Sequence, residues 1–270
     1  MKIRTLRLPF FTVITAMLLV GCRTEFERIR TSTDPETVYT AAMKFYDAEE
    51  YLKAQTLFEL VLNSYRGTAR AEELAFKYSY SHYYLNNFIL AAHHFNNFSN
   101  TFTSSERREE ADFMKAYSNY RLSPNPRLDQ EYTRTAIDQF QMFVNTYPNS
   151  DRTDECNELI ISGRKKLEAK EFSQGKLYYE LKSYNAAIHS FENLLKDFPE
   201  SANAEQIRFL ICKSAFDWAE RSFYEKKEER YSLAVKKYEE LKKKFPRSEY
   251  LAEASKMYNA SQSIIKSISG

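Results

Sequence analysis

Cysteine and histidine are the rarest of the residue types in this chain that could act as nucleophiles or bind a metal ion. The chain has three cysteines and four histidines. Cys156 and Cys212 are far apart in the sequence and show neither a C-x-x-C spacing nor a zinc-ligand pattern. They could form a disulfide in an oxidising compartment or remain two free thiols, and the sequence leaves both alternatives open.

The histidines give no stronger indication of chemistry. His93 and His94 are adjacent, so both rings cannot lie on one face of a helix as ligands, and His82 and His189 stand alone. The chain has no Gly-rich phosphate loop, no G-x-S-x-G and no H-E-x-x-H motif. We therefore expect no catalytic residue, no metal site and no cofactor, and predict that the protein is not an enzyme.

Cys22 differs from the other cysteines because it comes directly after an apolar segment. Three basic residues among the first seven precede the segment Leu8–Val20. This segment is shorter than the roughly 20 residues that a helix needs to cross a bilayer. The pattern is typical of a secretory signal peptide. The alternative is an uncleaved membrane anchor that happens to be followed by a cysteine.

The residues Leu19-Val20-Gly21-Cys22 resemble the bacterial lipobox. The resemblance implies cleavage after Gly21, a diacylglycerol on the Cys22 sulfur and acylation of the new amine by a chain such as palmitate. Several acyl chains together hold a protein stably on a membrane. Arg23 is not the Asp that retains lipoproteins in the inner membrane of enterobacteria, which favours an outer-membrane anchor that faces the periplasm.

The composition favours a helical protein of small net charge. The chain has 39 Lys and Arg against 37 Asp and Glu, a formal net charge of +2. Such a balance gives no net positive electrostatic field that would attract nucleic acid. Only 5 glycines occur beside 20 tyrosines and 20 phenylalanines. A chain with few glycines and many helix formers indicates an all-α domain.

Five stretches of the chain align with one another without gaps, beginning at Tyr51, Phe88, Thr133, Tyr184 and Tyr231. Each has an alanine at its fourth position and an aromatic residue at its eighth. These structural repeat positions are Ala54 and Phe58, Ala91 and Phe95, Ala136 and Phe140, Ala187 and Phe191, and Ala234 and Tyr238. Further apolar positions follow in steps of three and four, which trace one face of a helix. Internal repeats of this length are the signature of a solenoid.

The ends of the predicted helices also follow a pattern. Three copies read Pro-x-Ser, in which proline ends one helix and serine offers its oxygen to the free amides of the next. Asp34-Pro35 predicts the start of the first helix. The stretch from Arg152 to Lys182 predicts one long helix or two in series, and Ser123–Pro126 predicts a loop inside the third repeat. The Ala and Phe offsets resemble those of the tetratricopeptide repeat, so we expect an α-solenoid of five tetratricopeptide-like helix pairs plus a C-terminal helix.

A lipobox followed by five such repeats is similar to the BamD family of lipoproteins, which belong to the machine that assembles outer-membrane β-barrels. The most specific likeness lies between Asn125 and Ser201. It consists of Ala136, Phe140, the YPNS segment from Tyr147 to Ser150, Leu167, Glu171, Phe172, Tyr178, Tyr179, Ala186, Ala187 and Phe198-Pro199. The chain departs from the family in its long, lysine-rich C-terminal helices.

The resemblance implies a division of the chain and a set of partners. We expect a signal peptide at 1–21, an acylated linker at 22–33, N-terminal repeats at 34–122 and C-terminal repeats with the final helix at 123–270. In the family the C-terminal repeats dock on a periplasmic domain of BamA, and other Bam lipoproteins join the complex. The N-terminal repeats are thought to engage the C-terminal signal of unfolded outer-membrane barrel proteins.

The first helix of each pair would line the concave side of such a solenoid. The family's inward-facing positions fall on Tyr39, Met43, Tyr46, Phe76, Tyr80, Tyr83, Phe113, Tyr117 and Tyr120. Rigid aromatic walls would suit an extended peptide that ends in an aromatic residue. The same side chains could instead pack between helices, and the sequence leaves both interpretations open.

Two other functions remain as alternatives. One is a repeat lipoprotein that scaffolds peptidoglycan synthases, hydrolases or other cell-envelope enzymes. The other is a lipoprotein that captures a solute, which would need large pocket-forming insertions that the regular repeats here do not favour.

Overall fold

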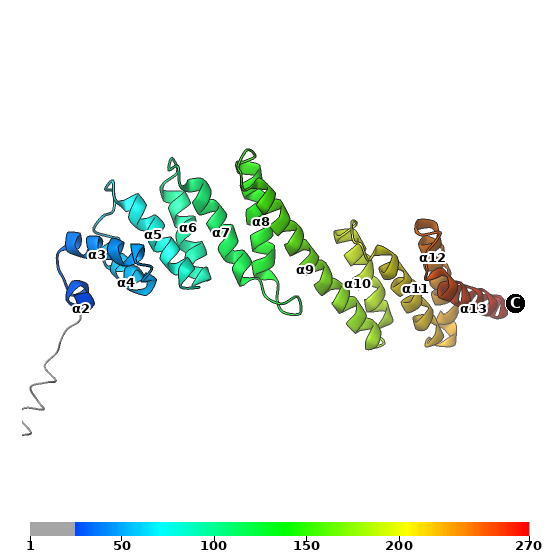
Figure 1. Ribbon diagram of the computed structural model, residues 1–270. Helices are drawn as coiled ribbons and strands as arrows, with labels where there is room; N and C mark the ends of the chain where they lie inside the picture. The colour runs from blue at the N-terminus through cyan, green and yellow to red at the C-terminus, as the bar shows by residue number, and fades with distance from the viewer. Residues whose placement is uncertain (1–24, 270) are drawn as a thin grey trace, which may run out of the picture. The chain divides into compact units, whose positions relative to one another are not determined.

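The computed structural model describes residues 25–269, so the predicted signal peptide and Cys22 lie outside the described residues. Every regular element in this range is an α-helix, and no strand is present between residues 25 and 269 (Figure 1). The helices are α2 (Glu25–Arg30), α3 (Pro35–Asp47), α4 (Tyr51–Val61), α5 (Ala71–Tyr84), α6 (Phe88–Thr101), α7 (Arg108–Leu122), α8 (Glu131–Thr146), α9 (Thr153–Glu180), α10 (Tyr184–Asp197), α11 (Ala204–Glu220), α12 (Tyr224–Lys244) and α13 (Leu251–Ser269).

The order of these helices confirms the predicted fold. Five consecutive pairs run from α3–α4 to α11–α12, and α13 is the C-terminal helix. The stretch predicted as one long helix or two is the single helix α9, and residues 123–130 form the predicted loop between α7 and α8. The chain is therefore an all-α protein built from tetratricopeptide-like helix pairs.

The described chain forms two compact units, which divide after Arg121. In the first unit α3 packs on α4, α4 on α5, and α5 on α6. In the second unit each helix from α8 to α13 packs on the next. The division between N-terminal and C-terminal repeats that the resemblance implies falls after residue 122, one residue further along.

The alanine and aromatic columns of the repeat lie in the core. All ten of these side chains are buried. In the second unit Phe191 packs with Ala187, Leu194 and Ile207 in one apolar cluster. Small residues let neighbouring helices approach, and the aromatic rings fill the space beside them, which is the arrangement that the periodicity predicts.

Gly175 on α9 lies directly against a core side chain of α10. A Cβ atom added there would lie 2.5 Å from Cε1 of Phe191 on α10. Phe191 itself is 0% exposed. The ring therefore occupies the space that any larger residue at position 175 would need.

The helix starts follow the predicted chemistry with one difference. The Asp34 carboxylate accepts hydrogen bonds from the amides of Glu36 and Thr37, and Pro35 is the first residue of α3. In the Pro-x-Ser copies, however, the serine oxygen bonds a turn residue ahead of the helix. Ser150 Oγ accepts from the Arg152 amide at 3.1 Å, while α9 begins one residue later. The serine oxygen reaches only the amide two residues further along the chain, which still belongs to the turn after proline. The serine therefore stabilises this turn and not the first turn of the helix.

Three turns within helix pairs contain a residue with positive φ that is not glycine. These residues are Glu49, Asn86 and Lys182, with φ of 60°, 60° and 59°. The next amide after each bonds a carbonyl of the preceding helix, for example Asn87 N to His82 O at 2.9 Å. This hydrogen bond defines a helix end of the Schellman type, which usually contains glycine. The glycine-poor sequence therefore gave no signal for these turns.

The segment expected to be a linker contains a helix. In α2, Phe26 and Ile29 lie on one face, and Ile29 is buried in the cluster that includes Val38 and Leu57. Phe26 contacts the ring of Phe45 on α3, with 5.8 Å between ring centroids. Two apolar residues three apart are enough to hold one and a half helical turns against α3 and α4, but too few to be recognised by periodicity.

Candidate functional site

The nine residues predicted to line a groove come from α3, α5 and α7, all in the first unit. Tyr39 and Phe113 are buried, and the other seven are partly exposed. Most of these seven also pack between helices, as Phe76 does against Phe95 and Phe98 of α6. These side chains therefore pack between helices and at the same time remain partly accessible. Their role in binding stays a prediction.

Six of the nine residues form a continuous series of ring contacts along α5 and α7, which we call the aromatic face: Phe76, Tyr80, Tyr83, Phe113, Tyr117 and Tyr120. Ring centroids are 5.1 Å apart for Phe76 and Tyr80, and 6.5 Å for Tyr80 and Tyr83. Tyr83 and Tyr117 join α5 to α7 at 6.3 Å. Tyr117 then stacks on Phe113 at 5.6 Å and on Tyr120 at 5.9 Å. Edge and offset contacts of this kind hold rings rigidly.

One of the three residues from α3, Tyr46, connects to the aromatic face through two rings that were not among the predicted groove residues. Tyr46 contacts Tyr51 at 5.6 Å, and Tyr51 stacks on Tyr84 at 4.4 Å. Tyr84 in turn stacks on Tyr80 at 5.7 Å. Tyr51 is the aromatic first position of its repeat, a signal that was visible in the alignment. Tyr84 has no matching position in the other repeats, so no periodic signal pointed to it.

Charged groups border the aromatic face on two sides. The Tyr80 hydroxyl donates a hydrogen bond to the Glu110 carboxylate. At the other end, Arg121 donates to the Tyr83 hydroxyl at 3.2 Å, and its guanidinium lies 4.6 Å from the ring centroid of Phe88. Arg121 is exposed. The face thus presents aromatic rings with polar tips and two stacked cations, since the Arg107 guanidinium also lies 5.3 Å from the ring centroid of Phe76.

Tyr46 and Tyr84 keep their protons at neutral pH. Burial is the main reason that the pKa of Tyr46 and the pKa of Tyr84 are raised above the ordinary value. Their hydroxyl groups therefore act as neutral donors and acceptors. Nothing in this arrangement activates a nucleophile.

The second unit carries exposed apolar side chains at two turns. Leu177 and Leu181 lie at the end of α9, and Phe223 and Tyr224 lie at the start of α12. The α9–α10 and α11–α12 turns lie on the same edge of this unit (Figure 1). Phe223 is 84% exposed, which is unusual for so large an apolar residue. We call these four residues the apolar edge.

Cys156 and Cys212 are free, buried thiols. Burial raises the pKa of Cys156 to about 11 and the pKa of Cys212 to about 12. A thiol is a poor nucleophile and metal ligand until it loses its proton. The two side chains therefore act as small apolar groups in the core.

His82 of α5, which is buried, stacks on His94 of α6, which is partly buried. His82 is 3% exposed, and its ring lies 4.8 Å from that of His94, nearly parallel to it. Tyr78 contacts both rings edge-on. Neither ring nitrogen of His82 has a hydrogen-bond partner within the described residues. Across residues 25–269 no group of three or more His, Cys, Asp or Glu side chains could hold a metal ion.

This histidine stack predicts a loss of stability in acid. Burial lowers the pKa of His94 to about 4 and also lowers the pKa of His82, although Glu59 on α4 opposes the second shift. His93 adds to the shift at His94. The unfolded chain therefore binds protons near the ordinary histidine pKa of about 6.5, before the folded chain does. Stability contributed by the neutral rings is present above that pH and is lost as the pH falls toward 4.

The test compares urea unfolding of the wild-type chain and of His94→Gln at several pH values between 7 and 4. We expect the unfolding midpoint to fall less steeply with pH in the variant, because glutamine does not titrate. Equal pH dependence in both proteins would show that the stack does not couple folding to protons. His189→Gln is the control, since His189 is exposed on α10.

These features define the class of protein: an all-α chain of tetratricopeptide-like helix pairs with an aromatic face in one unit and an apolar edge in the other. Residues 31–217, more than two thirds of the chain, match the YfiO family, described as outer membrane lipoprotein. The chain therefore belongs to this family. No helix between residues 25 and 269 is long and apolar enough to span a bilayer.

Solved structures with some likeness to the chain include several tetratricopeptide-repeat proteins. The TPR2AB domain of yeast Sti1, solved as a complex with pHSP90, is 12% identical with a TM-score of 0.41, over 84% of this chain and 98% of that one. The TPR domain of P58(IPK) is 15% identical with a TM-score of 0.41, over 86% and 66%. A thermophilic TPR protein from Thermus thermophilus is 12% identical with a TM-score of 0.32, over 85% and 99%.

Proposed function

We propose that this protein is a lipid-anchored scaffold of the β-barrel assembly machine on the periplasmic side of the outer membrane. It would be held to the membrane through acylated Cys22, bind a periplasmic domain of BamA with its second unit, and receive unfolded barrel proteins on its first. Membership of an outer membrane lipoprotein family supports the location. The resemblance to BamD supports the partners, which include the other Bam lipoproteins.

The aromatic face is the observation that carries the proposal. An unfolded barrel protein ends in a strand that alternates apolar and aromatic residues and finishes with an aromatic residue and a free carboxylate. The partly exposed rings of Tyr80, Tyr83 and Tyr117 offer flat apolar contacts at low entropic cost. Arg121 at the border of the face supplies a cation for the terminal carboxylate. The role is binding and positioning, with no chemistry.

The apolar edge is the surface of the second unit that best suits a stable partner. Exposed apolar residues that gather on one face mark protein contacts more often than single exposed residues do. Anchoring both proteins to the same membrane raises their effective concentration, so a modest affinity is sufficient. We assign the edge to BamA because the family docks BamA on its C-terminal repeats.

Charge substitutions on the apolar edge test this assignment. Phe223→Glu combined with Tyr224→Glu should lower the recovery of BamA with the full-length protein from cells by at least about tenfold, because a desolvated aromatic anchor is replaced by a buried charge. Both side chains are exposed, so the fold should be little affected. Leu128→Glu with Met142→Glu is the matched control on exposed residues elsewhere in the same unit. If the first variant recovers as much BamA as the wild-type protein, the BamA contact lies on another surface.

A further inference from the structure

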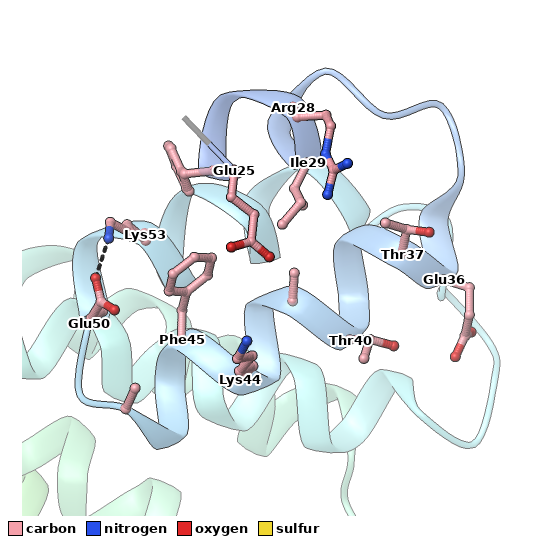
Figure 2. Close-up of a pocket in the computed structure, with 13 residues that line it drawn as sticks. Glu25, Arg28, Ile29, Glu36, Thr37, Thr40, Lys44, Phe45, Glu50 and Lys53 are labelled. Carbon is pink, nitrogen blue, oxygen red and sulfur yellow. Dashed lines mark hydrogen bonds and ion pairs between the residues drawn. The ribbon is translucent and has the colours of Figure 1, made fainter. Parts of the chain in front are cut away.

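A pocket lies between the first three described helices, at the end of the chain nearest to Cys22. Residues of α2, α3 and the start of α4 enclose a volume of about 860 Å³ (Figure 2). Its floor is apolar and consists of Phe26 and Ile29 from α2 with Ala41 and Phe45 from α3. The pocket is separate from the aromatic face, none of whose residues line it.

Charges of both signs surround this floor, and some of them have no ion-pair partner. Glu36 is held by Arg70 at 2.7 Å, and Lys53 pairs with Glu50. Glu25, Arg28 and Lys44 also line the pocket, and within residues 25–269 none of these three makes an ion pair. Figure 2 shows the Glu25 carboxylate and the Lys44 ammonium directed into the space between α2 and α3. Two cations and one carboxylate are thus left for a ligand.

The proposed lipid anchor would place this pocket at the membrane surface. Residues 22–24 separate the acylated sulfur from α2, and three extended residues reach at most about 10 Å. The headgroup layers add roughly 5–8 Å on each side of the hydrocarbon core of a bilayer. A pocket that begins at Glu25 therefore lies within reach of lipid headgroups for as long as the anchor is inserted.

We propose that the pocket binds the headgroup of a zwitterionic amino-phospholipid, phosphatidylethanolamine, an inference that rests on the proposed anchor at Cys22. Arg28 and Lys44 bind the phosphate through charge-assisted hydrogen bonds. Glu25 accepts hydrogen bonds from the primary ammonium group. The glycerol and the first methylene groups lie on Phe26 and Phe45, which gives the apolar floor a contact that a soluble phosphate would not use.

The arrangement distinguishes this headgroup from an anionic one. Phosphatidylglycerol offers the phosphate but no ammonium, so Glu25 would repel it instead of adding a bond. Binding at this site fixes the orientation of the first helix pair relative to the membrane. The anchor alone fixes only the distance of this helix pair from the membrane.

The test uses the full-length acylated protein in vesicles of phosphatidylethanolamine and phosphatidylglycerol, with a small fraction of either lipid carrying a photoreactive group at the start of one acyl chain. We expect crosslinks from photoreactive phosphatidylethanolamine on peptides within residues 25–53, and fewer from phosphatidylglycerol. Arg28→Glu with Lys44→Glu should lower the phosphatidylethanolamine crosslinks by about tenfold. Lys165→Glu, an exposed cation on α9, is the control and should change nothing.

The anchor and the pocket give separate readouts. Flotation of the vesicles reports the anchor, which Cys22→Ser should abolish and the pocket variants should leave intact. Crosslinks that are equal in the wild-type protein and the double variant, or equal for the two lipids, would overturn the headgroup site even where flotation is normal. Loss of flotation in the wild-type protein would refute the anchor instead. Arg28→Lys with Lys44→Arg keeps both charges and should preserve the crosslinks.

Discussion

Replacing Phe191 with alanine is expected to lower the free energy of unfolding of the second unit by about 3–5 kcal/mol, the range for removing a buried aromatic ring. The ring is fully buried in the cluster that joins α9, α10 and α11. The neighbouring helices are held by their other contacts, so the vacated space should close only in part. Urea unfolding followed by circular dichroism measures the change.

A double-mutant cycle with Gly175 isolates the contact that causes this effect. In the wild-type chain Gly175→Ala places a methyl group against the Phe191 ring, where an added Cβ would be 2.5 Å from Cε1, so we expect it to destabilise by about 1–3 kcal/mol. In the Phe191→Ala background the ring is gone, and the same substitution should be neutral or stabilising by up to about 1 kcal/mol, because alanine is the better helix former. Additive effects would show that the two residues do not share this space.

The second large effect is expected on the aromatic face. Tyr83→Ala with Tyr117→Ala should weaken binding of a C-terminal barrel-protein peptide by at least about thirtyfold, because even one central aromatic residue is worth about 2 kcal/mol or more in peptide recognition. The two rings bridge α5 and α7, so the substitutions open a gap in the middle of the face. Fluorescence anisotropy with the labelled peptide and the full-length protein gives the affinity.

Two comparisons separate recognition from unfolding. Tyr132→Ala, on an exposed tyrosine of α8, should leave the affinity unchanged. Amidation of the peptide's C-terminus should weaken binding to the wild-type protein but not to Arg121→Ala, if that guanidinium receives the carboxylate. If the Tyr83 and Tyr117 variant binds the peptide within about twofold of the wild-type affinity, the aromatic face is not part of the binding site.

The fold could be predicted from the sequence because the repeat is regular. The features that were not predicted also have physical reasons. The alanine and aromatic columns predicted which faces are buried because the same packing problem recurs in each pair. The turns at Glu49, Asn86 and Lys182 escaped prediction because their backbone conformation usually requires glycine. Helix α2 was not predicted because its two apolar residues, Phe26 and Ile29, are too few to show a helical period.

The candidate site was predicted in part. Positions on the first helices pointed to Tyr80, Tyr83 and Tyr117, which do form one series of ring contacts. Tyr84 was not foreseen because it lies outside the repeated positions. The apolar edge was not foreseen either, since Phe223 lies outside the aligned repeats and only the structure shows it exposed at the start of α12.

Crosslinking in intact cells tests the central claim most directly. The full-length protein would be crosslinked, recovered in detergent, and its partners and linked residues identified by mass spectrometry. We expect BamA in stoichiometric amount, linked through residues of the second unit beyond 122. Absence of BamA together with recovery of peptidoglycan synthases or hydrolases would contradict this claim and identify the protein as a scaffold of cell-wall enzymes.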